Sequence, residues 1–346
     1  RLIMVFKELK ETLKILKNSK KISCFFMGNT VKKENLDFYI TDLRENSKFI
    51  FASAIIYSDK IARNIAKLID GKVDIILIDT EKKTYSNKKN KIVNIERTTK
   101  EVVKKSKIFT YKGNDLTVDA ADTFLSNYYL KDIRGIGGKK ILIIGSGNIG
   151  FKLALKLVEN GGNVFLYRRN TKILKNIVSS INFIKPRGTK SGAYKLNTLG
   201  YNLNNYDIII GTTNGKSVLS KKHVSTFKKK VLILDIGKGI FEEDALQTAI
   251  LNQFNLFRLD ITPAYFACLE NINSTFKLNS INPIKTKTIG NLKLALKGIL
   301  TLKDTIIVDR LNNPKKIYGI SDGFGSFKKR NNKKMKTIYQ KLQIKR

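Results

Sequence analysis

Apolar runs alternate with helical patterns from the first residues of the chain. In the N-terminal third the pattern predicts a helix and two strands, over residues 5–19, 22–29 and 49–56. Ser58 is a suitable N-cap for a helix over 59–70, and VDIILIDT then predicts a buried strand. A strand, a helix and a strand within about 30 residues form a βαβ unit. The N-terminal region is therefore predicted to be α/β.

The middle of the chain repeats this alternation more regularly. Strands are predicted at ILIIG, NVFLYR, YDIIIGTT, VLILDIG and LFRLDIT, and helices over 149–160, 171–180, SKKHVSTF and EEDALQTAILNQ. The strands are continuous in Ile, Leu and Val, which is typical of parallel strands buried on both faces. The pattern predicts a doubly wound parallel sheet with helices on both sides.

The remaining segments give weaker patterns. They predict a polar, basic surface loop at 81–92, a second strand at KIVNIE, helices over 99–106 and 118–130, a helix near 289–300, and a hairpin at TIIVDR–LNNPKK–IYGIS. Arg134 to Gly138 is typical of a flexible joint. We therefore expect three parts: an N-terminal α/β substrate domain (1–134), a cofactor domain (135–265) and a C-terminal helix, hairpin and basic tail (266–346).

Three glycines follow the first strand of the middle region. Gly145, Gly147 and Gly150 form a G-x-G-x-x-G motif that ends a strand and opens a helix, with a second strand at the right distance. The first glycine permits a tight turn, the second lets the backbone approach a diphosphate, and the third allows close helix–strand packing. The helix N-terminus favours the anion. The motif predicts a Rossmann dinucleotide site over the loop residues, which are Gly145, Ser146, Gly147, Asn148, Ile149 and Gly150.

The end of the second strand indicates which dinucleotide is bound. NAD sites commonly carry Asp or Glu there for the ribose 2′-hydroxyl. This chain has Arg168 and Arg169 instead. A guanidinium suits a 2′-phosphate, which an acid would repel. NADP(H) is therefore favoured over NAD.

Two later strand ends add polar or small residues to the predicted site. Thr212, Thr213 and Asn214 follow YDIIIG, and Gly237 follows VLILDI. Ligands of doubly wound sheets cross the carboxyl ends of the strands. These residues could border the nicotinamide and its ribose, or they could form ordinary turns.

Composition removes several other classes of protein. Two cysteines and a single histidine, His223, leave too few residues for a disulfide framework or a histidine-based zinc site, and reduced thiols fit a cytoplasmic protein. No apolar run reaches the roughly 20 residues that cross a bilayer.

The net charge of +38 raises the question of an anionic partner. Lysines outnumber arginines 54 to 12 and the excess is spread along the chain, which fits biased composition as well as binding. Only residues 326–346 concentrate basic side chains without acids. A solvated helix or tail is the simpler interpretation there, so a nucleic-acid partner is not expected, and a homodimer is left open.

A family resemblance follows from these motifs. YRRNTKIL is similar to the Asn-Arg-Thr turn of shikimate dehydrogenases, and IIIGTTNGKSVLS…KKKVLILDIG resembles the late strands of methylenetetrahydrofolate dehydrogenases. The resemblance covers roughly residues 112–240. It implies a two-domain NAD(P)-dependent dehydrogenase. The substrate signatures of both families are absent, since residues 1–185 contain no proline.

The resemblance also implies where to look for acid–base chemistry. Such enzymes use a Lys and an Asp in the cleft between their domains. The candidates here are Lys60, Lys112 and Asp119, each of which could instead be a solvated or helix-terminal charge. We expect an NADP(H)-dependent oxidoreductase acting on a small polar substrate. The alternatives are an NAD(P)-binding regulatory module without turnover and a nucleic-acid-associated protein.

Overall fold

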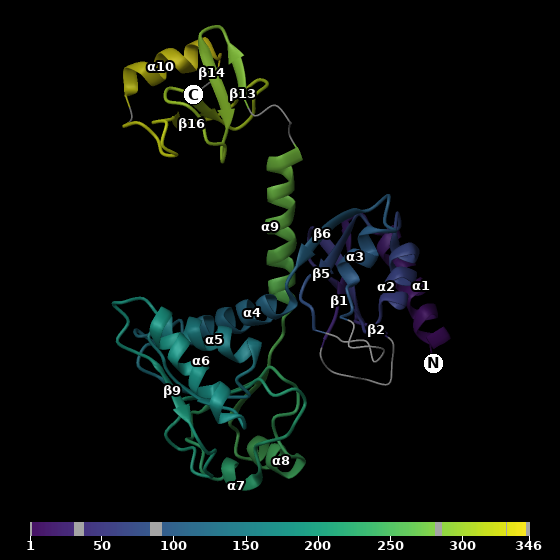
Figure 1. The fold of residues 1–346 in the computed structure, drawn as a ribbon, viewed down its shortest axis with the longest axis vertical. Coiled ribbons are helices and arrows are strands. Elements are labelled where there is room, and N and C mark those ends of the chain that lie inside the picture. Colours follow the sequence, from purple (N-terminus) through teal and green to yellow (C-terminus); the bar gives the residue numbers. More distant parts are fainter. Residues whose placement is uncertain (1, 31–37, 84–91, 281–285, 330, 344–346) are drawn as a thin grey trace. The chain divides into compact units, whose positions relative to one another are not determined.

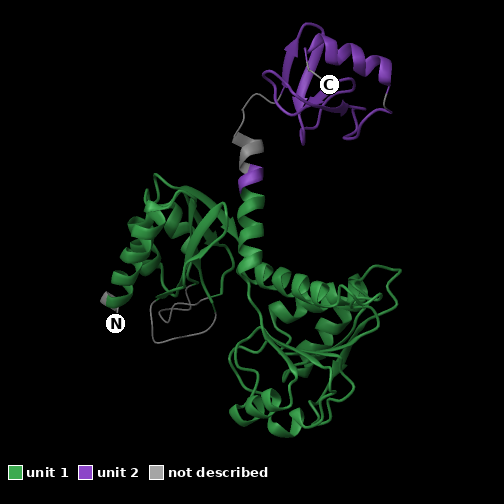
Figure 2. Ribbon diagram, turned by 180° about the vertical axis from the view of Figure 1, so that it is seen from behind, with its two compact units in different colours: residues 1–272 green, residues 273–346 purple. Residues whose placement is uncertain are grey.

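The computed structural model describes residues 2–30, 38–83, 92–280, 286–329 and 331–343. The chain divides into two compact units, residues 1–272 and 273–346 (Figure 2). The first unit holds two large sheets and the second a small one. Each unit is considered by itself.

The first sheet is built from the N-terminal α/β region. Its elements are α1 (Leu2–Asn18), β1 (Ile22–Gly28), β2 (Phe38–Ile40), β3 (Arg44–Glu45), β4 (Phe49–Ile56), α2 (Asp59–Ile69), β5 (Ile75–Asp79), α3 (Ile95–Lys100) and β6 (Lys107–Tyr111). The strand order is β2-β4-β1-β5-β6, with β3 also pairing with β4. Strands β4, β1, β5 and β6 are parallel, and β2 and β3 are antiparallel edge strands. The α/β prediction for this region is confirmed.

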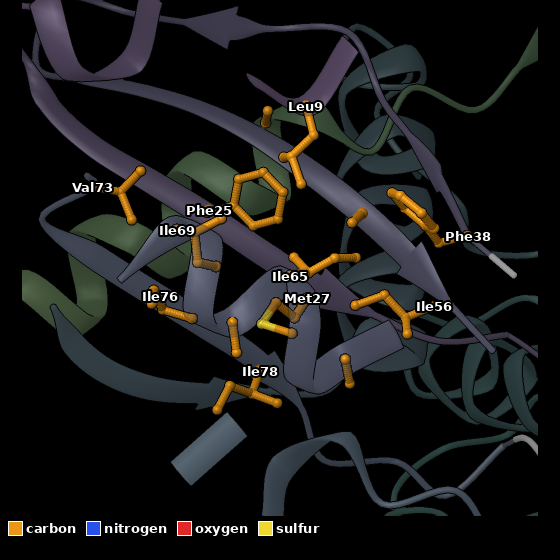
Figure 3. Packing of buried hydrophobic residues seen from close by; sticks show 14 of the residues in the cluster. Leu9, Phe25, Met27, Phe38, Ile56, Ile65, Ile69, Val73, Ile76 and Ile78 are labelled. Carbon is orange, nitrogen blue, oxygen red and sulfur yellow. The ribbon is translucent and has the colours of Figure 1, made fainter. Parts of the chain in front are cut away.

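Both faces of this sheet are apolar. Phe25 and Met27 of β1 face the helices α1, α2 and α3 in one core (Figure 3). Their neighbours Cys24 and Phe26 point to the opposite face, as successive strand residues do. That second face is covered by Tyr265 and other residues of α9 (Thr262–Ser280), a helix that follows the second sheet in sequence.

The second sheet has the order of a Rossmann fold. Its elements, entered through α4 (Gly113–Tyr128), are β7 (Lys140–Ile144), α5 (Asn148–Glu159), β8 (Asn163–Tyr167), α6 (Thr171–Ile184), β9 (Ala193–Leu196), β10 (Ile208–Gly211), α7 (Lys221–Val224), β11 (Leu232–Asp235), α8 (Glu243–Leu251) and β12 (Asn255–Arg258). The order β12-β11-β10-β7-β8-β9 is parallel throughout. Figure 1 shows α4, α5 and α6 toward one side of this region and α7 and α8 toward the other. One core packs α4, α5 and α6 on one face, and another packs α7 and α8 on the other. The predicted doubly wound sheet is confirmed.

The second unit is a four-stranded sheet with one helix. It contains β13 (Thr286–Ile289), β14 (Leu292–Leu296), β15 (Ile306–Val308), β16 (Ile317–Ile320) and α10 (Asn332–Lys341). Met335 and Ile338 of α10 pack on Leu294, Ile306 and Ile320 of the sheet. The predicted hairpin is confirmed, since β15 and β16 pair antiparallel.

Several predictions for the weaker segments are wrong. The helix near 289–300 is replaced by β14 and its turns, because Leu292, Leu294 and Leu296 alternate with a period of two. The strand predicted at KIVNIE is replaced by the start of α3, which has Asn94 as N-cap. The helix predicted over 99–106 is displaced, because α3 spans Ile95–Lys100. Strand β6 and helix α9 were not predicted. Of the loop predicted at 81–92, residues 84–91 lie outside the described residues.

Candidate functional site

The glycine loop joins β7 to α5 through a tight turn at the N-terminus of the helix. Gly145 has a φ of 100°, a conformation that favours glycine. Gly147 is the N-cap of α5 and makes no side-chain cap, and a Cβ there would lie 4.0 Å from the nearest non-adjacent heavy atom, the carbonyl oxygen of Gly145. The first helical bond runs from the N–H of Phe151 to the carbonyl of Gly147. The earlier N–H groups of this helix have no acceptor within the helix, and such a helix N-terminus favours an anion.

At the other two glycines of the motif, Gly145 and Gly150, neighbouring residues leave no room for a side chain. A Cβ at Gly145 would meet the backbone of Thr212 at 2.8 Å, and one at Gly150 would meet the Oγ1 of Thr212 at 2.9 Å. The Thr212 hydroxyl donates to the carbonyl of Gly145. Ser146 is fully buried, with its hydroxyl 3.3 Å from the carbonyl of Tyr167. The loop is thus held rigidly against the ends of β8 and β10, and Gly147 is left open.

The two arginines after β8 have different environments. Arg168 is half-buried, and its Nη1 donates to the carbonyl of Ser146 at 2.8 Å. Arg169 is exposed, and Asn170 caps α6 by accepting from the N–H of Ile173. The structure therefore brings the Arg168 guanidinium, with its remaining donors, to the edge of the glycine loop.

The ends of β10 and β11 lie against each other. A Cβ at Gly237 would lie 1.8 Å from the carbonyl oxygen of Thr213, so the glycine is required by backbone packing alone. The Thr213 hydroxyl donates to the carbonyl of Lys216, which closes a local turn. Asn214 is exposed. These residues lie at the carboxyl edge of the sheet with the glycine loop, and their local contacts are those of turns.

Helix α4 runs beside α5 in the same direction. Asn114 bonds to Asn148 at 3.0 Å, Lys152 pairs with Asp115, and Lys156 pairs with Asp119 at 3.2 Å. Because these partners advance together along both helices, the N-terminus of α4 lies beside the glycine loop. These contacts thereby fix the start of α4 next to the glycine loop.

The three catalytic candidates occupy different places in this arrangement. Lys60 is exposed in the first turn of α2, and Lys112 is the exposed N-cap of α4, 3.9 Å from Asp115. Asp119 pairs with Lys156, eight residues and about 12 Å along α5 from Asn148. Burial lowers the pKa of Lys156, but its bonds to Asp119 and Asp122 outweigh that and raise it. The structure does not gather the three side chains into one cluster.

A charged cluster that the sequence interpretation missed lies at the carboxyl end of β5. Asp79 is only 2% exposed, and Lys83 places its ammonium 2.8 Å from both Asp79 and Glu81. Asp79 also accepts from the N–H of Glu81, and Glu81 accepts from the N–H of Asn114. Lys152 of α5 lies 3.8 Å from Glu81. The cluster therefore connects the first sheet to the helix that follows the glycine loop.

Topology makes this position a natural binding site. In the first sheet the chain runs from β1 to β4 on one side and then to β5 and β6 on the other. The strand order therefore reverses between β1 and β5, and ligands of open α/β sheets bind at the carboxyl ends of strands flanking such a reversal. Asp79 ends β5, and Asn29 follows β1. The signal in the sequence was the acid at the end of VDIILID, which is hard to distinguish from a turn residue.

Asn29 adds an unsatisfied polar group to the same edge. It is 5% exposed, and its amide nitrogen donates to the carbonyl of Glu81 at 3.0 Å. Its side-chain oxygen is buried and has no hydrogen-bond partner among the described residues. Buried polar atoms are nearly always satisfied. An unpaired acceptor at the strand reversal is consistent with a hydroxyl or amine donor from a bound molecule.

His223 is a structural residue. It is 6% exposed in the short helix α7, where its Nδ1 accepts from the N–H of Ser220 at 3.1 Å. Burial lowers the pKa of His223 below its usual value. Within the described ranges, no group of three His, Cys, Asp or Glu side chains is placed to hold a metal ion. In the same part of the chain, no helix has the length and apolar character needed to cross a membrane.

Comparisons with known proteins bear on the second sheet. Residues 129–245 match the family model of shikimate/quinate 5-dehydrogenases. A search of curated protein sequences finds no match.

Solved structures give a weak overall likeness. A dipicolinate synthase polypeptide from Bacillus halodurans is 12% identical over 73% of this chain and 97% of its own, with a TM-score of 0.37. A shikimate dehydrogenase in complex with NADP+ is 12% identical over 70% and 85%, with a TM-score of 0.39. L-tryptophan dehydrogenase from Nostoc punctiforme is 13% identical over 60% and 57%, with a TM-score of 0.38. At these scores the likeness carries no functional argument.

The family match and the strand order agree on the middle of the chain. The match covers the glycine loop, both arginines and the ends of β10 and β11. It confirms the resemblance predicted from YRRNTKIL and the late strands. Residues 129–245 are therefore those of a divergent Rossmann domain of the NAD(P)-dependent dehydrogenase type.

Proposed function

We propose that the protein is an NADP(H)-dependent oxidoreductase that transfers a hydride to or from a small polar substrate. The glycine loop supports this proposal most directly, because Gly147 leaves the N-terminus of α5 open to a diphosphate. Arg168, bonded to the loop carbonyl of Ser146, supplies a cation for a 2′-phosphate. When bound, the nicotinamide would supply hydride chemistry, and the protein would supply orientation and a proton.

We place the substrate at the strand reversal of the first sheet. Asn29 offers an unpaired acceptor, and Lys83 offers an ammonium held by two carboxylates. In the reducing direction Lys83 would donate a proton to a carbonyl oxygen as the hydride reaches the carbon, and in oxidation it would take that proton back. This proposal adds Lys83 to Lys60, Lys112 and Asp119. It keeps residues 1–134 as the substrate part and 135–265 as the cofactor part.

The cofactor proposal is tested by NADPH fluorescence titration of the full chain. Gly147→Ala should fold, because its φ of −90° suits any residue and its Cβ meets no close atom. The added methyl group would obstruct the diphosphate, so we expect binding at least about tenfold weaker, or ~1.4 kcal/mol. Gly188→Ala is the matched control, because a Cβ there has nothing within 4 Å. A wild-type protein that does not bind NADPH contradicts the proposal.

The proton-donor proposal is tested on a panel of hydroxy and oxo acids. Lys83→Met should lower kcat by about 10²–10⁴ and leave the NADPH dissociation constant unchanged. Lys60→Met and Lys112→Met are measured beside it. If one of these abolishes turnover while Lys83→Met retains it, the proton donor is that lysine instead.

A cofactor-binding module without turnover is the second candidate. The observation that favours it is the placement of the catalytic candidates: Lys60 and Lys112 are exposed, and Asp119 is used in helix pairing. Such a protein would bind NADPH but leave every acid of the panel unreduced. Substituting these residues would then change nothing in the titration.

A further inference from the structure

The C-terminal unit carries a disproportionate positive charge. Residues 273–346 contain 18 basic and 3 acidic residues, whereas residues 1–272 contain 48 and 25. Biased composition alone would raise lysine in both units without removing the acids from one of them. The imbalance therefore belongs to this unit and calls for an anionic partner.

The three acids of this unit have partners within it. Asp304 pairs with Lys328 and Lys334, Asp309 pairs with Arg310, and Asp322 accepts from the N–H groups of its own loop. The pKa of Asp304 is lowered to about 2 by its bonds to the two lysines. Most of the other described lysines of the unit have no ion pair with an acid, and Lys297, Lys316 and Lys329 are the ones considered below. These three charges are available to a ligand.

Aromatic rings gather in one hollow beside those charges. Tyr318, Phe327 and Tyr339 line a cavity of 220 Å³ between β16, the following loop and α10. Phe327 also borders a second cavity of 170 Å³. A Cβ at Gly319 would lie 2.6 Å from the Phe327 ring, so this glycine lets the ring approach β16 closely. Both hollows are smaller than the ~300–1,000 Å³ of enclosed small-molecule sites.

Tyr318 is an aromatic ring that lies directly beside two of these lysines. Its side chain is 38% exposed, and the ammonium groups of Lys297 and Lys316 each lie 5.2 Å from its ring centroid. Phe327 is 50% exposed. Half-exposed rings bordered by lysines are the arrangement that receives stacked bases and their phosphates. An incoming base would compete with a lysine for the ring face and present its phosphate to the displaced ammonium.

We propose that the C-terminal unit binds single-stranded nucleic acid. Bases stack on Tyr318 and Phe327, and Lys297, Lys316 and Lys329 contact the phosphates. A duplex would not expose its bases to these rings, so the single strand is the occupant that uses both the charge and the hollow. This proposal is independent of the oxidoreductase function proposed above for the first unit.

The test measures the anisotropy of a short fluorescein-labelled oligouridylate with the full chain at about 50 to 200 mM salt. Tyr318→Ala should weaken binding about tenfold, because one stacked base is lost, and Tyr318→Phe should keep near wild-type affinity. Lys297→Gln/Lys316→Gln should reduce the slope of log K against log salt by about 1.4, or about 0.7 for each lost phosphate contact. Circular dichroism melting confirms that each variant is folded.

The matched control removes two exposed lysines from α1 of the first unit, Lys10→Gln/Lys14→Gln, and should leave affinity and slope unchanged. An equal loss in this control would show diffuse attraction to total charge and overturn the site. Equal affinity for Tyr318→Ala and Tyr318→Phe would remove the stacking role. Leu300, which lines the second cavity, is 86% exposed, and Phe324 of the same unit is 94% exposed. Because such exposed apolar side chains could enter a lipid surface, phosphatidylserine vesicles form a second arm. Binding to vesicles and not to the oligonucleotide would assign the surface to lipid and overturn the proposal.

Discussion

In the function proposed above, Arg168 is the residue that selects NADP(H) over NAD. Its neighbour in sequence, Arg169, is exposed, whereas Arg168 is tied to the Ser146 carbonyl. That bond fixes the direction of the guanidinium at the loop, and a fixed fork loses less entropy when it binds a phosphate. The sequence could not tell the two arginines apart, because both follow the same strand.

We expect Arg168→Asp to shift the preference from NADPH toward NADH. The carboxylate would repel a 2′-phosphate and accept from a 2′-hydroxyl. The change should be at least about tenfold in the ratio of the two dissociation constants, or ~1.4 kcal/mol. Fluorescence titration with both nucleotides measures it. Arg169→Asp is the matched control and should alter the ratio much less; an unchanged ratio in Arg168→Asp would remove the role given to this side chain.

Gly237 illustrates what the sequence could not reveal about single residues. Its place after a strand allowed either a cofactor contact or an ordinary turn, and the structure adds that the backbone of Thr213 is so close that only glycine fits. Gly147 carries the same residue type for the opposite reason, an open approach. A glycine in a motif therefore predicts a constraint on the backbone, and only packing shows whether a ligand or a neighbouring loop imposes it.

At the level of elements, the pairing of α4 with α5 defines the site. Asn114, Asp115 and Asp119 meet Asn148, Lys152 and Lys156 in order. Pairs at such half-exposed positions are worth only ~0.2–1 kcal/mol each. Their main effect is to align the two helices, because together they set which turn of α4 lies beside the glycine loop.

Exchanging the charges of one pair tests whether Asp119 has a catalytic or a structural role. Asp119→Lys alone should lower the free energy of unfolding by about 0.5–1 kcal/mol, because it faces Lys156. Adding Lys156→Asp should restore most of that loss, as measured by urea unfolding. If turnover is also restored in the double variant, Asp119 serves packing. If the double variant is stable but inactive, its carboxylate is needed for the reaction.

The prediction of elements succeeded for strands that are buried on both faces of the sheet. It failed where the spacing of apolar residues fits both a helix and a strand. β7, β10 and β11 are continuous apolar runs, which only buried strands or helices tolerate, and their glycine and polar ends fixed the choice. LKLALKGIL fits a helix by composition, although its alternation is that of β14. Helix α9 was not predicted, although Tyr265, Leu269 and Ile272, which pack on the first sheet, follow helical spacing.

On the scale of the whole molecule, a helix that follows the second sheet packs back on the first sheet. After β12, Tyr265 and Leu269 of α9 pack on Phe26, Phe51 and other residues of the first sheet. The rings of Phe26 and Tyr265 meet edge-on at 4.6 Å. Burial raises the pKa of Tyr265 to about 12. No local sequence pattern predicts such a contact, because Tyr265 lies more than two hundred residues after Phe26 and Phe51.

Removing that ring should destabilise the first unit strongly. Tyr265→Ala is expected to lower the free energy of unfolding by about 3–5 kcal/mol, as for other buried aromatic truncations. Tyr265→Phe keeps the ring and loses a hydroxyl, which should cost about 0.5–1.5 kcal/mol. Urea unfolding of both variants separates the contribution of the ring from that of the hydroxyl. A cost below about 1 kcal/mol for the alanine would mean that α9 does not hold this face in solution.

The covering of the first sheet by α9 also has a consequence during synthesis. Residues 22–111 emerge from the ribosome well before residues 262–272, which close one of their faces. At about 5–20 residues per second the wait over some 150 residues lasts roughly 8–30 s. Throughout that interval Phe26 and Phe51 would be presented to water on a nascent chain. The segment is therefore a natural client for chaperones that bind exposed aromatic surface until the end of translation.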